Sequence, residues 1–125
     1  MPAARFTSFA TYQDLVAFIK CLEKGNSSNF CYSKGDNGVG ATGLTTAQVH
    51  TPMCALPLSE MVKKWGSKKA AMGKFVSCTI GDRTITCTLA DIGPSGVCDL
   101  NPAALLAFGF AQDKELSIQG TWSWA

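Results

Sequence analysis

The segment KFVSCTIGDRTITCTL, residues 74–89, decides the fold. Apolar and polar residues alternate on both sides of Gly81-Asp82, a dipeptide typical of tight hairpin turns. Because successive side chains of a strand point to opposite faces, the pattern predicts two antiparallel strands with one shared apolar face. That face is formed by Val76, Cys78, Ile80, Ile85, Cys87 and Leu89. The threonines of the second strand then face solvent.

Upstream, residues 11–25 carry the signals of an amphipathic helix. Thr11 is a suitable N-cap with Asp14 three residues on, and Gly25 is a suitable end. The apolar residues fall at helical spacing and are predicted to pack in a core: Leu15, Phe18, Ile19 and Leu22.

Shorter elements are expected along the rest of the chain. Residues 29–32 and 54–58 are predicted to be short strands, and residues 59–65 a short helix. Asn101 and Pro102 suit the first positions of another helix, and residues 116–124 alternate as a final strand. The glycine-rich segment 35–43 is either a surface loop or a wall of a substrate groove.

The overall composition limits the classes of partner. A length of 125 residues fits a single domain, and 46% hydrophobic against 16% charged residues suits a packed globule. A net charge of +2 is too small to argue for nucleic acid. The apolar run at residues 103–108 is far shorter than the ~20 residues of a membrane span. We therefore expect a monomer that binds neither nucleic acid nor membrane.

The six cysteines are the second compositional signal. None of them has the C-x-x-C spacing of zinc or redox sites: Cys21, Cys31, Cys54, Cys78, Cys87 and Cys98. Since His50 is the only histidine, a Cys/His zinc cluster lacks partners, and neither a metal site nor a cofactor is predicted. Three disulfides and buried free thiols both stay open. The hairpin loop can have two or four residues. If disulfides form, a four-residue loop would set Cys78 opposite Cys87 and pair them, leaving the other four cysteines to pair among themselves.

Disulfides would indicate an oxidising compartment, so the protein is expected to be secreted or extracytoplasmic. Residues 1–5 have no apolar signal-peptide core. Either a signal was removed or export uses another route.

Two motifs after the hairpin resemble a known fold family. TITCTLADIGP, residues 84–94, looks like the strand and Asp-x-Gly-Pro of the double-psi β-barrels, and DLNPAA, residues 99–104, resembles their helix start. That group includes expansins, rare lipoprotein A and relatives of glycoside hydrolase family 45. The ending IQGTWSWA, residues 118–125, is similar to that of kiwellins and barwin-like proteins. The resemblance implies a mainly β fold: a six-stranded double-psi β-barrel over residues 29–125, a helical N-terminal extension of residues 1–28, and short additional helices.

The resemblance also implies a catalytic pair. Asp99 matches the general acid of the related hydrolases, and Asp91 matches the aspartate that expansins need and that the related lytic transglycosylases use. Glycan cleavage needs a carboxylic acid to protonate the leaving oxygen, and its pKa must be raised by burial or by a neighbouring charge. The structural alternative is that Asp99 favours a helix N-terminus and that Asp91 caps its own turn.

Four further residues are expected to bind substrate in the groove: Tyr32, Asp36, His50 and Trp65. Trp65 lies within a lysine cluster formed by Lys63, Lys64, Lys68, Lys69 and Lys74. The cluster is either a solvated face or a patch for an acidic polymer, with Trp65 as a stacking platform.

Two functions follow from these expectations. The first is a protein that acts on cell-wall polysaccharide, peptidoglycan ahead of glucan, by acid-assisted cleavage or loosening in an open groove. The alternative is a non-enzymatic binding or inhibitor protein of the kiwellin and barwin-like kind, whose partner is a target protein.

Overall fold

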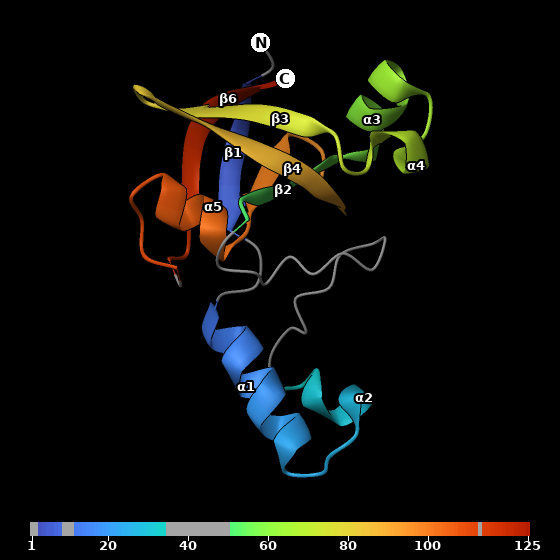
Figure 1. The fold of residues 1–125 in the computed structure, drawn as a ribbon, viewed down its shortest axis with the longest axis vertical. Helices are drawn as coiled ribbons and strands as arrows, with labels where there is room; N and C mark the ends of the chain where they lie inside the picture. Colours follow the sequence, from blue (N-terminus) through green and yellow to red (C-terminus); the bar gives the residue numbers. More distant parts are fainter. Residues whose placement is uncertain (1–2, 9–11, 35–50, 113) are drawn as a thin grey trace.

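The computed structural model describes residues 3–8, 12–34, 51–112 and 114–125, which build a closed β-barrel with helices outside it (Figure 1). The strands are β1 (Ala3–Ser8), β2 (Met53–Pro57), β3 (Phe75–Ile80), β4 (Arg83–Gly93), β5 (Val97–Leu100) and β6 (Ser117–Trp124). Their order round the barrel is β1-β5-β2-β4-β3-β6. The predicted class, a mainly β six-stranded barrel with short helices, is confirmed.

Two parallel strand pairs lie within an otherwise antiparallel barrel. β1 runs parallel to β5 and β2 runs parallel to β4, whereas the remaining neighbours are antiparallel. Parallel neighbours cannot be joined by a tight hairpin, so these pairs bring together segments that are distant in sequence. The structure thus shows a closed six-stranded barrel of mixed pairing.

The hairpin forms where it was predicted, with the shorter, two-residue loop. Ile80 lies opposite Arg83 across Gly81-Asp82, and Gly81 has a φ of 60° that suits such a turn. Cys78 therefore lies opposite Ile85, not opposite Cys87. The predicted Cys78–Cys87 disulfide is wrong for this structure, because both residues are free buried thiols.

The helices are α1 (Tyr12–Glu23), α2 (Ser28–Cys31), α3 (Leu58–Trp65), α4 (Lys68–Ala71) and α5 (Pro102–Ala107). α5 begins as predicted, since the Asn101 side chain accepts a hydrogen bond from the Ala104 N–H and Pro102 follows it. The same Asn101 oxygen accepts from the Met53 N–H at the start of β2. Asn101 is fully buried, so it joins the entry of α5 to the strand that separates β4 from β5. None of the helices in the described residues has the length and apolar character needed to cross a bilayer.

The N-terminal residues differ from the expected helical extension. Residues 3–8 form β1, which pairs with both β5 and β6, and Phe6 is fully buried in the barrel. Residues 29–31 are helical, not a strand, because the Ser27 side chain caps α2 by accepting from the Phe30 N–H. A disulfide from Cys31 to Cys21 of α1 holds this short helix in place.

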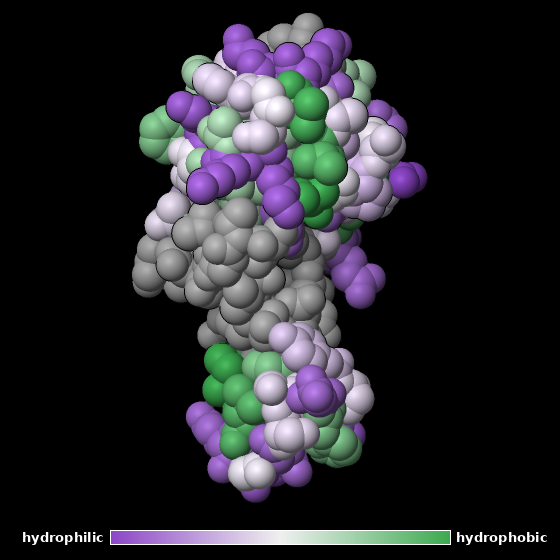
Figure 2. All heavy atoms as spheres, turned by 90° about the vertical axis from the view of Figure 1, so that its right-hand side faces the viewer, coloured by the Kyte–Doolittle hydropathy of each residue, from purple (hydrophilic) through white to green (hydrophobic). Residues whose placement is uncertain are grey.

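α1 and α2 pack on each other below the barrel in Figure 1. Phe18, Cys21 and Cys31 form their small buried cluster. Ile19 and Leu22, predicted to be core residues, are 43% and 40% exposed. Figure 2 shows apolar side chains at the surface of this lower body. Of the face that was predicted to pack in a core, Phe18 is buried, whereas the expectation is wrong for Ile19 and Leu22.

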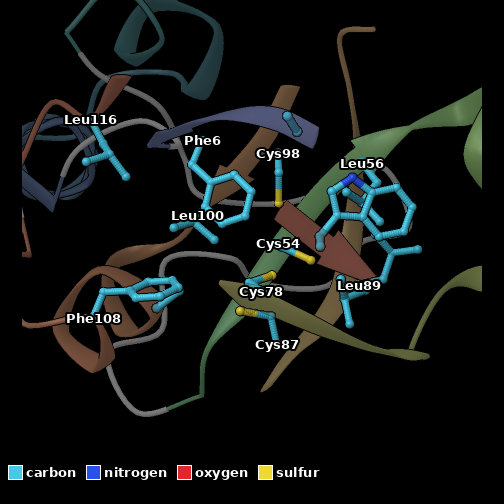
Figure 3. Packing of buried hydrophobic residues seen from close by; sticks show 14 of the residues in the cluster. Phe6, Cys54, Leu56, Cys78, Cys87, Leu89, Cys98, Leu100, Phe108 and Leu116 are labelled. Carbon is cyan, nitrogen blue, oxygen red and sulfur yellow. The ribbon is translucent and has the colours of Figure 1, made fainter. Parts of the chain in front are cut away.

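The main core fills the barrel interior (Figure 3). Its large apolar side chains come from strands far apart in sequence: Phe6, Leu56, Leu89, Leu100 and Trp122. Gly120 of β6 permits close approach, since a Cβ there would lie 2.5 Å from the Thr79 carbonyl oxygen.

Candidate functional site

Four neighbouring strands place Thr7, Asp99, Ala55 and Asp91 in one row. Thr7 pairs with Asp99, Asp99 with Ala55, and Ala55 with Asp91. Cys98 and Leu100 are buried in the barrel core, so Asp99 between them points to the outer side of the sheet. The two aspartates predicted to be catalytic thus flank one small residue.

A β-bulge brings Asp91 into this row. The β2–β4 register shifts between Cys54 and Ala55, so that Cys54 pairs with Leu89 while Ala55 pairs with Asp91. One extra residue in β4, Ala90, is passed over, and such a bulge re-aims the side chain that follows it. Without the shift, Ala90 would stand where Asp91 stands.

The surroundings of Asp99 change its acidity. Burial first, and the charge of Asp91 second, raise the pKa of the Asp99 carboxyl to about 6. The Thr7 hydroxyl donates a hydrogen bond to Asp99 Oδ1. A Cβ at position 93 would lie 3.6 Å from Asp99 Oδ2, so the glycine there leaves that oxygen uncrowded. This carboxyl can hold a proton near neutral pH and release it, as an acid catalyst must.

Asp91 also serves its own backbone. Its Oδ1 accepts a hydrogen bond from the Ile92 N–H. Local capping of this kind is the structural alternative named above for Asp91. The Asp91 side chain therefore lies beside Asp99 and also caps its own backbone.

The other predicted groove residues do not gather at the aspartates. Tyr32 ends α2, is 52% exposed, and packs against Phe18 in a tilted arrangement with ring centroids 5.1 Å apart. That position is on the lower body of Figure 1, away from the barrel. Asp36 and His50 lie outside the described residues.

Trp65 ends α3 and packs against the last strand. Its ring meets Trp124 edge-on with centroids 5.7 Å apart, and Trp124 in turn meets Trp122 at 5.3 Å. The Lys74 Nζ lies 4.6 Å from the centroid of the Trp65 ring and the Lys64 Nζ lies 5.6 Å from it. Trp65 was expected to offer a free ring face for stacking on substrate. Instead, both lysine ammonium groups lie over the ring and interact with it by cation–π attraction.

A groove of about 300 Å³ lies between α3 and the end of β6. Its lining combines tryptophan rings with charged side chains: Glu60, Lys63, Lys64, Trp122, Ser123 and Trp124. A smaller cavity of about 50 Å³ shares Glu60 and Trp122 with it and continues towards β1 and β5. The sequence indicated the lysines and Trp65, but the groove itself depends on α3 packing beside β6.

Comparisons with known proteins bear on the fold. No protein-family model matches the chain, and no curated protein sequence matches it. Among solved structures, the Streptomyces papain inhibitor is similar, with a TM-score of 0.51 and 17% sequence identity over 96% of this chain and 91% of that one. A likeness at this identity establishes a shared barrel fold.

The barrel interior also holds a cluster of cysteines, which the spacing of these residues in the sequence did not predict. Cys54, Cys78, Cys87 and Cys98 are all free and buried, and they belong to four different strands. The Sγ atoms of Cys54, Cys78 and Cys98 all lie within 4.8 Å of one another. The only available signal was strand alternation, which pointed Cys78 and Cys87 inwards but could not show what they would meet.

Proposed function

We propose that the chain is a non-enzymatic binding protein that holds a segment of a target protein in the groove between α3 and β6. The carrying observation is the groove itself, in which the partly exposed Trp124 lies over the buried Trp122, with Lys63 and Lys64 beside it. Tryptophan is enriched at the energetically dominant positions of protein interfaces, and desolvated pockets concentrate binding energy.

Support for a target class comes from the name of the similar structure, which is a papain inhibitor. We infer that this chain likewise binds a papain-type cysteine protease. Binding of a protease segment in the groove needs no catalytic group from this chain. The proposal is thus an inhibitor that acts by steric blockage.

The test is inhibition of papain with a small peptide substrate across a titration of the chain. The parent is expected to inhibit, and Lys64→Ala and Trp124→Ala are expected to weaken inhibition, Trp124→Ala by at least ~10-fold. Lys20→Ala, on exposed α1, removes the same charge elsewhere and should leave inhibition unchanged. Circular dichroism checks that each variant is folded. Absence of inhibition by the folded parent contradicts the proposed target.

A second function is favoured by the acidic row. Asp99, with its pKa raised to about 6 beside Asp91, is suited to donate a proton to a leaving oxygen in a cell-wall glycan. Incubation with purified peptidoglycan and plant-type glucans, followed by mass spectrometry, tests this function. Cleavage should fall by ~10²–10⁴ in Asp99→Asn, whereas the groove variant Lys64→Ala should keep it. Failure to release any product from either polymer would exclude both substrates.

A further inference from the structure

The four free thiols converge at the centre of the barrel. Cys54 of β2, Cys78 of β3 and Cys98 of β5 form a triangle with every Sγ···Sγ distance below 4.8 Å. The thiol of Cys87, on β4, interacts with those of Cys54 and Cys78. Figure 3 shows the four side chains turned into the same part of the core. All four residues are at most 1% exposed, so water does not solvate the cluster.

The strand register does not align these cysteines as disulfide pairs. Cys78 lies opposite Ile85, two residues from Cys87, and Cys54 lies opposite Leu100, two residues from Cys98. Diagonal positions of this kind have Cα atoms about 7–8 Å apart, whereas disulfides usually span about 4.4–6.8 Å. Cys21 and Cys31, which are bonded in the same structure, have Cα atoms 5.6 Å apart. Pairing Cys78 with Cys87, or Cys54 with Cys98, would therefore require the two strands of the pair to slide past each other.

We propose that Cys54, Cys78, Cys87 and Cys98 form a buried site for one thiophilic metal ion of the Zn²⁺ class. Thiolate sulfur selects soft or borderline ions over Mg²⁺ and Ca²⁺. Four sulfurs at the Zn–S distance of about 2.3 Å would be about 3.8 Å from one another. The Sγ atoms of Cys54, Cys78 and Cys98 lie within 4.8 Å of one another, so each of these three needs to move inwards by less than about 1 Å. The Cys87 thiol, which interacts with those of Cys54 and Cys78, has to turn towards them to complete the shell. Unlike a disulfide, a metal ion does not need two cysteines directly opposite each other on paired strands. It needs only sulfur atoms that point to one place, and the diagonal positions of these cysteines already provide that.

The site is closed, which indicates a structural ion. Four protein ligands complete a tetrahedral shell and leave no position for substrate. The ligands come from β2, β3, β4 and β5, so a bound ion would connect four of the strands of the barrel. Binding free energy would then add to folding free energy, because the unfolded chain does not assemble the site.

Binding exchanges protons for the ion without any redox step. Each coordinating thiol gives its proton to solvent and its sulfur lone pair to the metal, and the two positive charges of the ion offset two of the four negative charges of the thiolates. Because protons compete with the ion, affinity is expected to fall as pH falls.

The test uses the full chain, prepared without metal and with its core thiols reduced, and titrated with Co²⁺. We expect thiolate-to-cobalt charge-transfer bands and tetrahedral d–d bands that saturate at one equivalent. Zn²⁺ should then abolish these bands, and native mass spectrometry should find one Zn²⁺ per chain. The Tm should rise with Zn²⁺ concentration.

Matched variants separate this site from the other cysteines. Cys54→Ser and Cys98→Ser should each weaken Zn²⁺ binding by more than ~100-fold, since each removes a direct ligand. The double variant Cys21→Ser/Cys31→Ser leaves the barrel thiols intact and should bind one ion as the parent does. If a core variant fails to fold, the Co²⁺ spectrum of the unmutated chain still decides. Peptide mapping that finds the core cysteines paired in disulfides, or a reduced chain without thiolate–cobalt bands, would overturn the proposal.

Discussion

At the scale of single residues, Asp99 owes its chemistry to its surroundings. Burial comes first and the charge of Asp91 second among the causes that raise its pKa to about 6. Thr7 holds one of its oxygens, and Ala55 keeps the space between the aspartates free of bulk. Because the bulge beside Ala55 turns Asp91 into the row, a single backbone irregularity controls part of the acidity of Asp99.

Asp99→Asn is expected to stabilise the protein at about pH 7 and to leave its stability almost unchanged at about pH 4. The folded-state pKa of about 6 exceeds that of an unfolded aspartate, about 3.9, so the fold binds the proton more tightly. The stabilising contribution is complete below about pH 4 and is lost as pH rises through about 6. Asparagine can still accept from Thr7 and carries no charge, while half-burial limits the gain to ~1 kcal/mol.

Urea denaturation at the two pH values measures this effect. Asp82→Asn is the control, because Asp82 lies exposed in the hairpin turn. A lower stability of Asp99→Asn than of the parent at about pH 7 would contradict the prediction and would indicate that the carboxylate is engaged by a favourable partner.

At the scale of elements, α1 and α2 depend on each other. α2 has four residues, too few to form a stable helix alone, and its Ser27 cap satisfies only part of its first turn. The Cys21–Cys31 disulfide and the contact of Phe18 with Tyr32 fix it against α1. The helical pair has its own small cluster, separate from the barrel core.

Cys21→Ser/Cys31→Ser is expected to lower the stability of this helical pair by ~2–3 kcal/mol and to leave the barrel intact. The disulfide closes a short loop, with a sequence separation of 10 residues, and its main effect is to restrict the unfolded segment. Hydrogen exchange monitored residue by residue should show faster exchange in α1 and α2. Equal acceleration in β3 and β4 would mean that the two bodies unfold together.

At the scale of the whole molecule, strands from the two ends of the chain close the barrel. β1 near the N-terminus pairs with β6 near the C-terminus, and β1 also pairs in parallel with β5. Phe6 fills the interior from β1, with its ring centroid 6.4 Å from that of Phe108 after α5. The first strand is thus part of the structure that supports both the acidic row and the thiol cluster.

Phe6→Ala is expected to destabilise the whole protein by ~3–5 kcal/mol, the usual cost of a large cavity in a core. Phe75→Ala removes the same side chain from a position that is 59% exposed and should cost less than ~1 kcal/mol. Guanidinium denaturation followed by tryptophan fluorescence compares the two variants. A dispensable N-terminal extension would instead predict a negligible loss for Phe6→Ala.

The sequence alone determined the elements that depend on neighbouring residues. The alternation of residues 75–80 and 83–89, the Asn101-Pro102 helix start and the final strand near Trp122 and Trp124 all formed where they were predicted. Resemblance supplied Asp91 and Asp99 as a candidate pair, while Asp36 and His50 stay predictions. Strand periodicity and helix caps are local properties, so a single sequence can express them.

Tertiary structure decided everything that depends on which strands become neighbours. Only the barrel order places β2 between β4 and β5, which sets Ala55 between the two aspartates. In the same order, residues 3–8 pair with β5 as the strand β1. The order also brings cysteines that are widely spaced in the sequence close together in the core. Parallel pairing and barrel closure join segments far apart in the chain, and alternation within one strand carries no information about the strand beside it.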